Sequence, residues 1–221
     1  LGLDAQAESY FRRALDLQNR TLAPNHPTIA PLRFGLALAR WGQGDEAEAF
    51  RLAVQTAEHQ QALLATFAAE FAQRQSVAYR DVLMPATALA VTLAARRGDA
   101  QSIATAWHLE MVERGLVARA QAHRLAAARA TDDPAVAQAL DAWRQANAAR
   151  GAGWLDKKSD SARMARLTAA EETAERALWR STGQHAVPAA RAVADLADLA
   201  RALPVDALLI AYSDGLGANR N

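Results

Sequence analysis

The chain has 221 residues, of which 51% are hydrophobic, enough for a packed core in one or two domains. Its 25 basic and 24 acidic residues leave a net charge of +1, which gives no electrostatic basis for binding nucleic acid or an acidic membrane surface. The absence of cysteine excludes disulfides, thiolate metal sites and a cysteine nucleophile within this chain, and no apolar run approaches the ~20 residues of a membrane span.

The first 57 residues carry a repeated helical pattern. We predict a helix over residues 4–22, a loop at 23–27 that two prolines hold extended, and a second helix that ends near Trp41, before two glycines. The first helix places Ala7, Phe11 and Ala14 on one face, and Ala49 takes the place of Ala7 42 residues later. A period of that length is typical of a stacked array of helices.

These residues resemble the kinesin-light-chain type of tetratricopeptide repeat (TPR). The match is carried by the Arg-Arg-Ala-Leu run at 12–15 and by the Asn-His-Pro turn at 25–27, and it covers roughly residues 5–57. His26 is therefore interpreted as a turn residue rather than a ligand. The second unit departs from the family pattern at Arg40, Ala53 and Thr56, which marks it as a terminal unit because capping repeats are atypical.

Long alanine-rich helices follow in the sequence. We predict helices over about 45–75, 77–96 and 100–130, with a break near residues 75–76. Pro85 predicts a kink or a restart within the second of these helices. In the third, Asp99 is the predicted N-cap, and a row at four-residue spacing is formed by Ile103, Trp107, Met111 and Gly115.

An antiparallel helical hairpin is expected over about 134–149 and 160–181. Asp133 and Pro134 form a helix start signal, and the connection is the run RGAGWLDKKSD at 150–160. Each helix carries a stripe at alternating three- and four-residue spacing, typical of coiled-coil packing: Val136, Leu140, Trp143 and Asn147 on the first, and Met164, Leu167, Glu171, Ala174 and Leu178 on the second.

The chain ends in an element of a different kind. After a linker and a helix over 189–203, the run DALLIAYS at 206–213 is of β type and too short for a helix. A lone strand is unstable in water, so its partner strands must come from elsewhere. The predicted fold is all-α, a tetratricopeptide-like helical solenoid with long helices and an antiparallel hairpin, ending in one orphan β-strand.

A second resemblance covers roughly residues 58–213. The order of elements is similar to the helical region that precedes the CHAT domain in bacterial TPR-CHAT proteins, and a segment that opens that domain is matched at Leu203, Pro204, Ala207, Leu208 and Tyr212. CHAT domains are caspase-like, and the His and Cys of their peptidase chemistry have no counterpart here. The resemblance implies four segments: TPR units at 1–57, a long-helix continuation at 58–131, the hairpin at 132–182, and a linker helix with the first strand of a truncated CHAT-like domain at 183–221.

Two functions follow from these resemblances. The first is a regulatory and protein-interaction scaffold region of a cytoplasmic, caspase-like cysteine peptidase whose catalytic part is not in this chain. The second is a stand-alone helical-repeat scaffold or adaptor with no enzymatic activity. In either case the expected partner is a protein or peptide on the repeat surface, with no nucleic acid and no membrane, and a sheet partner is possible for residues 206–213.

No catalytic, cofactor-binding or metal site is predicted. His108 and Glu110 do not share a helix face, and His59 and His123 have no partner at metal-ligand spacing. Ser181 and His185 form a pair without an acid or an oxyanion donor. Four arginines at five-residue spacing spiral around one helix and are interpreted as solvated: Arg114, Arg119, Arg124 and Arg129.

Overall fold

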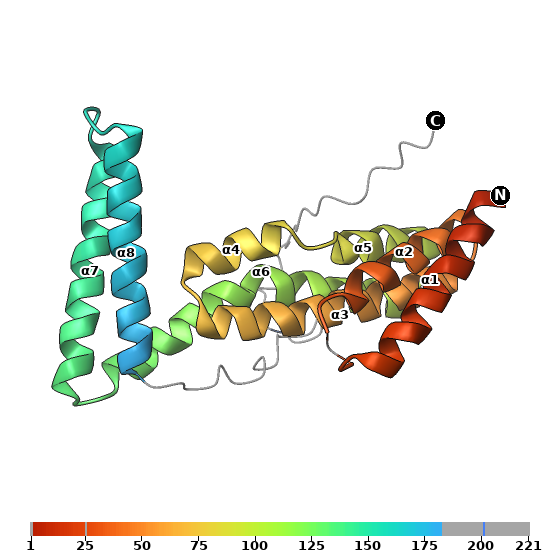
Figure 1. Cartoon of the computed structure of the whole chain (residues 1–221), viewed down its shortest axis with the longest axis horizontal. Helices are drawn as coiled ribbons and strands as arrows, with labels where there is room; N and C mark the ends of the chain where they lie inside the picture. Colours follow the sequence, from red (N-terminus) through yellow and green to blue (C-terminus); the bar gives the residue numbers. More distant parts are fainter. Residues whose placement is uncertain (1, 25, 183–200, 202–221) are drawn as a thin grey trace. The chain divides into compact units, whose positions relative to one another are not determined.

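The computed structural model describes residues 2–24, 26–182 and 201, and all regular structure among them is α-helical (Figure 1). The all-α prediction is confirmed for these residues, whereas the predicted strand at 206–213 and most of the predicted helix at 189–203 lie outside them. The helices are α1 (Gly2–Thr21), α2 (Ile29–Gly42), α3 (Glu46–Glu70), α4 (Gln73–Asp81), α5 (Ala86–Arg97), α6 (Ala100–Arg129), α7 (Pro134–Leu155) and α8 (Ser161–Ser181).

The described residues form two compact units. The first, here the repeat unit, comprises residues 2–24, 26–63, 82–115 and 201; the second, here the hairpin unit, comprises residues 64–81 and 116–182. Helices α3 and α6 each contribute to both units, since the boundary falls within them. The four-segment division expected from the sequence stays a prediction.

In the repeat unit, α1 packs on α2 through the face expected from the sequence. Ala7, Phe11 and Ala14 are all partly buried, and the ring of Phe11 lies against Gly35 of α2. A Cβ atom added at Gly35 would lie less than 3.0 Å from three atoms of that ring. Gly35 is therefore the position that allows α1 and α2 to approach closely.

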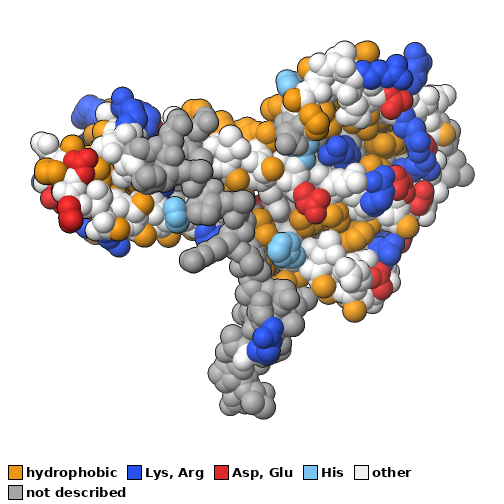
Figure 2. Space-filling view, turned by 90° about the horizontal axis from the view of Figure 1, so that it is seen from below, with side chains coloured by type: hydrophobic (Ala, Val, Ile, Leu, Met, Phe, Trp, Pro, Cys, Tyr) orange, Lys and Arg blue, Asp and Glu red, His pale blue; other side chains and the backbone are white. Residues whose placement is uncertain are grey.

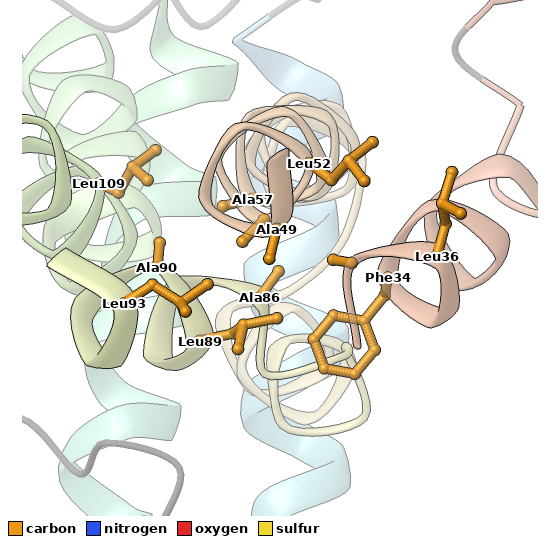
Figure 3. Close-up of a cluster of buried hydrophobic side chains, with 12 residues drawn as sticks. Phe34, Leu36, Ala49, Leu52, Ala57, Ala86, Leu89, Ala90, Leu93 and Leu109 are labelled. Atoms are coloured by element: carbon orange, nitrogen blue, oxygen red, sulfur yellow. The ribbon is translucent and has the colours of Figure 1, made fainter. Parts of the chain in front are cut away.

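The core of the repeat unit continues beyond α3 (Figure 3). Ala49 and Ala53 of α3 are fully buried in a cluster with Leu89 and Leu93 of α5 and Leu109 of α6. The expectation that the second unit is a terminal repeat stays a prediction. At the position where the family has an aromatic residue, the small side chain of Ala53 lies in the same buried cluster as Leu89 and Leu93 of α5.

The connection between α3 and α5 differs from the predicted one. The predicted break at residues 75–76 is wrong: α3 ends at Glu70, and Ser76 lies inside α4, where its hydroxyl donates to the carbonyl of Ala72 at 3.2 Å. The restart predicted at Pro85 is confirmed, because α5 begins at Ala86. Proline disfavours helical geometry in the residue before it and cannot donate an amide hydrogen bond, so the helix starts anew after it.

Helix α6 begins where the sequence predicted. Gly98 ends α5 with a left-handed φ of +68°, and Asp99 accepts a hydrogen bond from the amide of Ser102 at 2.8 Å. The predicted row is only partly buried: Ile103 is 46% exposed, whereas Trp107, Met111 and Gly115 are partly buried. The fully buried side of α6 lies beside this row and comprises Ser102, Ala106, Leu109, Val112, Leu116, Val117, Ala120, Arg124 and Ala128.

Helices α7 and α8 lie side by side as the predicted hairpin, with N-caps at Asp133 and Asp160 (Figure 1). The α8 stripe is confirmed, since all five of its residues are at least partly buried, but Asn147 of the α7 stripe is exposed. Helix α7 is also longer than expected and ends at Leu155 rather than 149. The reason is Gly153: a Cβ there would meet Leu167 at 2.6 Å, so the glycine serves close helix packing instead of a loop.

Candidate protein-binding surface

A polar network joins α1 and α2 at the start of the repeat unit. The Glu8 carboxylate pairs with Arg40 at 2.8 Å and with Arg12 at 2.7 Å, and it accepts a hydrogen bond from the Gln43 side chain at 2.8 Å. The Gln43 hydrogen bond, followed by the charges of Arg40 and Arg12, lowers the pKa of Glu8 below its usual value. Arg40, which stands where the resembled family has an aromatic residue, thus binds a carboxylate that remains ionised.

Exposed apolar side chains follow the outer side of α1. Leu3, Tyr10 and Leu17 are 81%, 69% and 64% exposed and lie seven residues apart; we call them the α1 outer face. On α2, Leu38 is 37% exposed. Sequence reasoning missed these residues, although the seven-residue spacing on α1 was a visible signal.

The histidines weighed as candidate ligands are not brought together. Nδ1 of His26 is hydrogen-bonded to the hydroxyl of Thr28 at 2.8 Å within the inter-helix turn. His108 and His123 are exposed, whereas His59 is buried in α3. Among the residues that the structure describes, no group of three or more His, Cys, Asp or Glu side chains could hold a metal ion.

The Ser181 and His185 pair does not form a described site. The hydroxyl of Ser181 donates to the carbonyl of Leu178 at 2.8 Å within the last turn of α8. His185 lies outside the described residues.

One of the four spiralling arginines is not solvated. Arg124 is 8% exposed and donates hydrogen bonds to the carbonyls of Ala68 and Phe71, with its guanidinium 5.1 Å from the centre of the Trp179 ring. Burial lowers the pKa of Arg124. The prediction failed because these partners lie more than 50 positions away in sequence.

The surface charge does not separate into patches of one sign on the face seen in Figure 2, where basic and acidic side chains lie beside one another. Within the described part of the chain, no single helix is long and apolar enough to cross a membrane. Helices α4 and α5 reach that length and hydropathy only when they are taken together.

Helices α1 to α3 carry a 42-residue repeat and pack through small residues. The N-terminal part of the chain therefore has the architecture of a helical repeat. Residues 1–62 match the tetratricopeptide repeat family, so this part carries repeats of the TPR type. No curated protein and no solved structure matches the chain significantly.

Proposed function

We propose that this chain is a protein-interaction scaffold and that residues 2–62 present the binding surface. The observation that carries the proposal is the TPR match over residues 1–62, because repeats of this type generally mediate protein–protein interaction. The Glu8 network and the Phe11–Gly35 contact fix α1 against α2, so the surface is preorganised for a partner. Leu38 provides an exposed apolar contact on α2.

The finer proposal is that the chain is the regulatory part of a cytoplasmic TPR-CHAT peptidase. It is supported by the resemblance of residues 58–213 to the region before a CHAT domain. In this proposal the hairpin at 132–182 passes a binding event onward, and residues 206–213 pair with a sheet supplied from outside residues 2–182. The chain has no cysteine, so any thiol chemistry would be supplied outside it.

Affinity capture with the full chain, followed by calorimetry with each captured protein after its purification, tests the scaffold function. Leu38→Glu places a charge on the repeat surface and should weaken binding at least about tenfold, which corresponds to about 1.4 kcal/mol. Ile103→Glu is the matched control, since it makes the same change at an exposed side chain of the repeat unit outside residues 1–62. Equal loss in both variants, or no loss in either, argues against the proposed surface.

The coding sequence after Asn221 separates the two versions of the function. A following domain that carries His and Cys after successive strands supports the peptidase version. A stop codon directly after Asn221 supports the stand-alone scaffold, in which residues 206–213 dock on another protein's sheet.

A further inference from the structure

The end of the α7–α8 hairpin carries two adjacent exposed apolar side chains. Trp154 and Leu155, the last two residues of α7, are 70% and 87% exposed. They lie beside the connection to α8, at the end of the hairpin opposite the buried cluster that contains Val136 and Leu178 (Figure 1). Large apolar side chains that are exposed together and surrounded by polar residues are typical of an interaction site.

Positive charge surrounds this apolar pair. Residues 150–166 include five basic residues and two aspartates, and the only lysines of the chain, Lys157 and Lys158, are among them. Lys157, Lys158 and Arg166 are exposed, and none of the three forms an ion pair with another residue that the structure describes. The expectation that no membrane is a partner rested on the net charge of the whole chain, which conceals this local excess.

The two aspartates are bound within the turn and do not neutralise the lysines. Asp156 accepts a hydrogen bond from the amide of Lys158 at 2.9 Å and pairs with Arg163 at 2.6 Å, and these contacts lower its pKa. Asp160 caps α8 by accepting a hydrogen bond from the amide of Arg163 at 2.6 Å. One arginine and one helix N-terminus thus offset the two carboxylates, and the lysine charges remain for a partner.

We propose that this end of the hairpin binds the surface of an anionic lipid bilayer, with Trp154 and Leu155 among the lipid headgroups and Lys157 and Lys158 beside lipid phosphates. Tryptophan is enriched at membrane interfaces, and anionic lipids attract lysine at the surface. Nucleic acid would use the tryptophan and the lysines but not Leu155, which is the more exposed apolar side chain. An acidic protein would need a pocket matched to two protruding side chains, whereas a bilayer takes them up without one.

The binding is peripheral and weak, because only two apolar side chains enter the headgroup layer. Arg166 lies five residues beyond the start of α8, so it is ~8 Å further from the bilayer, within the ~10 Å Debye length at 0.1 M salt. Higher salt should therefore weaken binding. The inference is independent of the proposed function, which concerns residues 2–62.

Sedimentation of the full chain with lipid vesicles tests the role of charge. The chain should bind vesicles of equal parts phosphatidylcholine and phosphatidylglycerol at least about tenfold more tightly than vesicles of phosphatidylcholine alone. Lys157→Gln combined with Lys158→Gln should weaken binding to the mixed vesicles at least about tenfold. Arg13→Gln combined with Arg20→Gln is the matched control, since it removes the same charge at exposed positions of α1 and should have a much smaller effect.

The apolar pair is tested in the same way. Leu155→Ser should weaken binding to the mixed vesicles, whereas Leu3→Ser, the same change at a side chain that is 81% exposed, should not. On these vesicles the tryptophan emission of the wild type should shift to shorter wavelength. Trp154→Phe should lose most of that shift while it still sediments with the vesicles.

Three results would overturn the proposal. The first is equal binding to both kinds of vesicle, and the second is an equal loss in the two double variants, because either would leave the charge at the hairpin end without a specific role. The third is no binding to the mixed vesicles, even if an RNA oligonucleotide or polyglutamate binds and depends on Lys157 and Lys158.

Discussion

The side chain of Glu175 in α8 accepts a hydrogen bond from the backbone amide of Gln73, the first residue of α4, at 3.0 Å. The indole of Trp179 donates to the same oxygen at 3.1 Å. Arg124 binds the carbonyls of Ala68 and Phe71 at the end of α3. The Glu175 side chain thus lies at the N-terminal, positive end of α4, and the Arg124 guanidinium lies at the C-terminal, negative end of α3. These contacts hold the bend between α3 and α4.

Removal of the Glu175 carboxylate should loosen this bend. Glu175→Ala leaves the amide of Gln73 and the indole of Trp179 without their acceptor. Loss of the bond to the buried indole should lower the free energy of unfolding by about 1–3 kcal/mol, and loss of the bond to the less buried amide should add a smaller amount. Glu175→Gln keeps an acceptor oxygen and should cost much less. Urea unfolding of both variants measures the difference, and equal losses would show that the hydrogen bonds contribute nothing.

The protonation of Glu175 should make stability depend on pH. Burial is the main cause that raises its pKa above 4.5, and the charge of Glu171 adds to it, while the hydrogen bonds from Gln73 and Trp179 and the charge of Arg124 act in the opposite direction. A raised pKa means that the folded state binds the proton more tightly than the unfolded state. This group therefore contributes stability at pH values below 4.5, and the contribution is lost as the pH rises through the pKa of the folded state.

Glu175→Gln isolates that contribution because every other group titrates in both proteins. The free energy of unfolding of the wild type, minus that of the variant, should fall as the pH rises from 4.5 toward neutrality. A difference that grows with pH over this range would reverse the sign and contradict the burial argument.

Substitution of Arg124 should destabilise the hairpin unit. Arg124→Lys keeps the charge but loses the planar fork that contacts two carbonyls and stacks on Trp179. We expect the free energy of unfolding to fall by at least about 1.5 kcal/mol, which is the lower end of the range for a hydrogen bond to a charged group. Arg129→Lys, at an exposed position of the same helix, provides the comparison in thermal unfolding. A smaller loss at 124 than at 129 would rule out the role assigned to Arg124.

Two glycines of α7 should respond in opposite ways to alanine. Gly151→Ala meets nothing within 4 Å and should stabilise the protein by up to ~1 kcal/mol through helix propensity. Gly153→Ala brings a Cβ to 2.6 Å from Leu167 and 3.0 Å from the sulfur of Met164, so displacement of these side chains should cancel that gain. The melting temperatures of Gly151→Ala and Gly153→Ala test this prediction. An equal rise in both variants would refute the close packing at Gly153.

Local signals in the sequence predicted the ends of several helices correctly. Asp133 and Pro134 start α7, and Gly98 ends α5, because a cap depends on residues only a few positions away. The α3–α4 bend was misplaced for the opposite reason. It is held by Arg124 and Glu175, whose partners lie 53 to 102 positions away, so nothing near residues 71–72 indicates it.

The extension of α7 shows tertiary contacts overriding propensity. Glycines at 151 and 153 favour a loop in the sequence, yet α7 continues through both, and Gly153 packs against Leu167 of α8.

In the candidate surface, the repeat and its turn were predictable from spacing. The exposure of Tyr10 was not, because periodicity alone does not distinguish an apolar stripe that is covered from one that is open.

Amide hydrogen exchange with a purified partner shows whether residues 2–62 form the protein-binding surface. A partner identified by capture and confirmed by calorimetry should slow exchange in α1 and α2. At partner concentrations near the dissociation constant of the wild type, Leu38→Glu should reduce that protection without altering exchange in α7 and α8. Protection confined to α7 and α8, with α1 and α2 unchanged at saturating partner, would contradict the account.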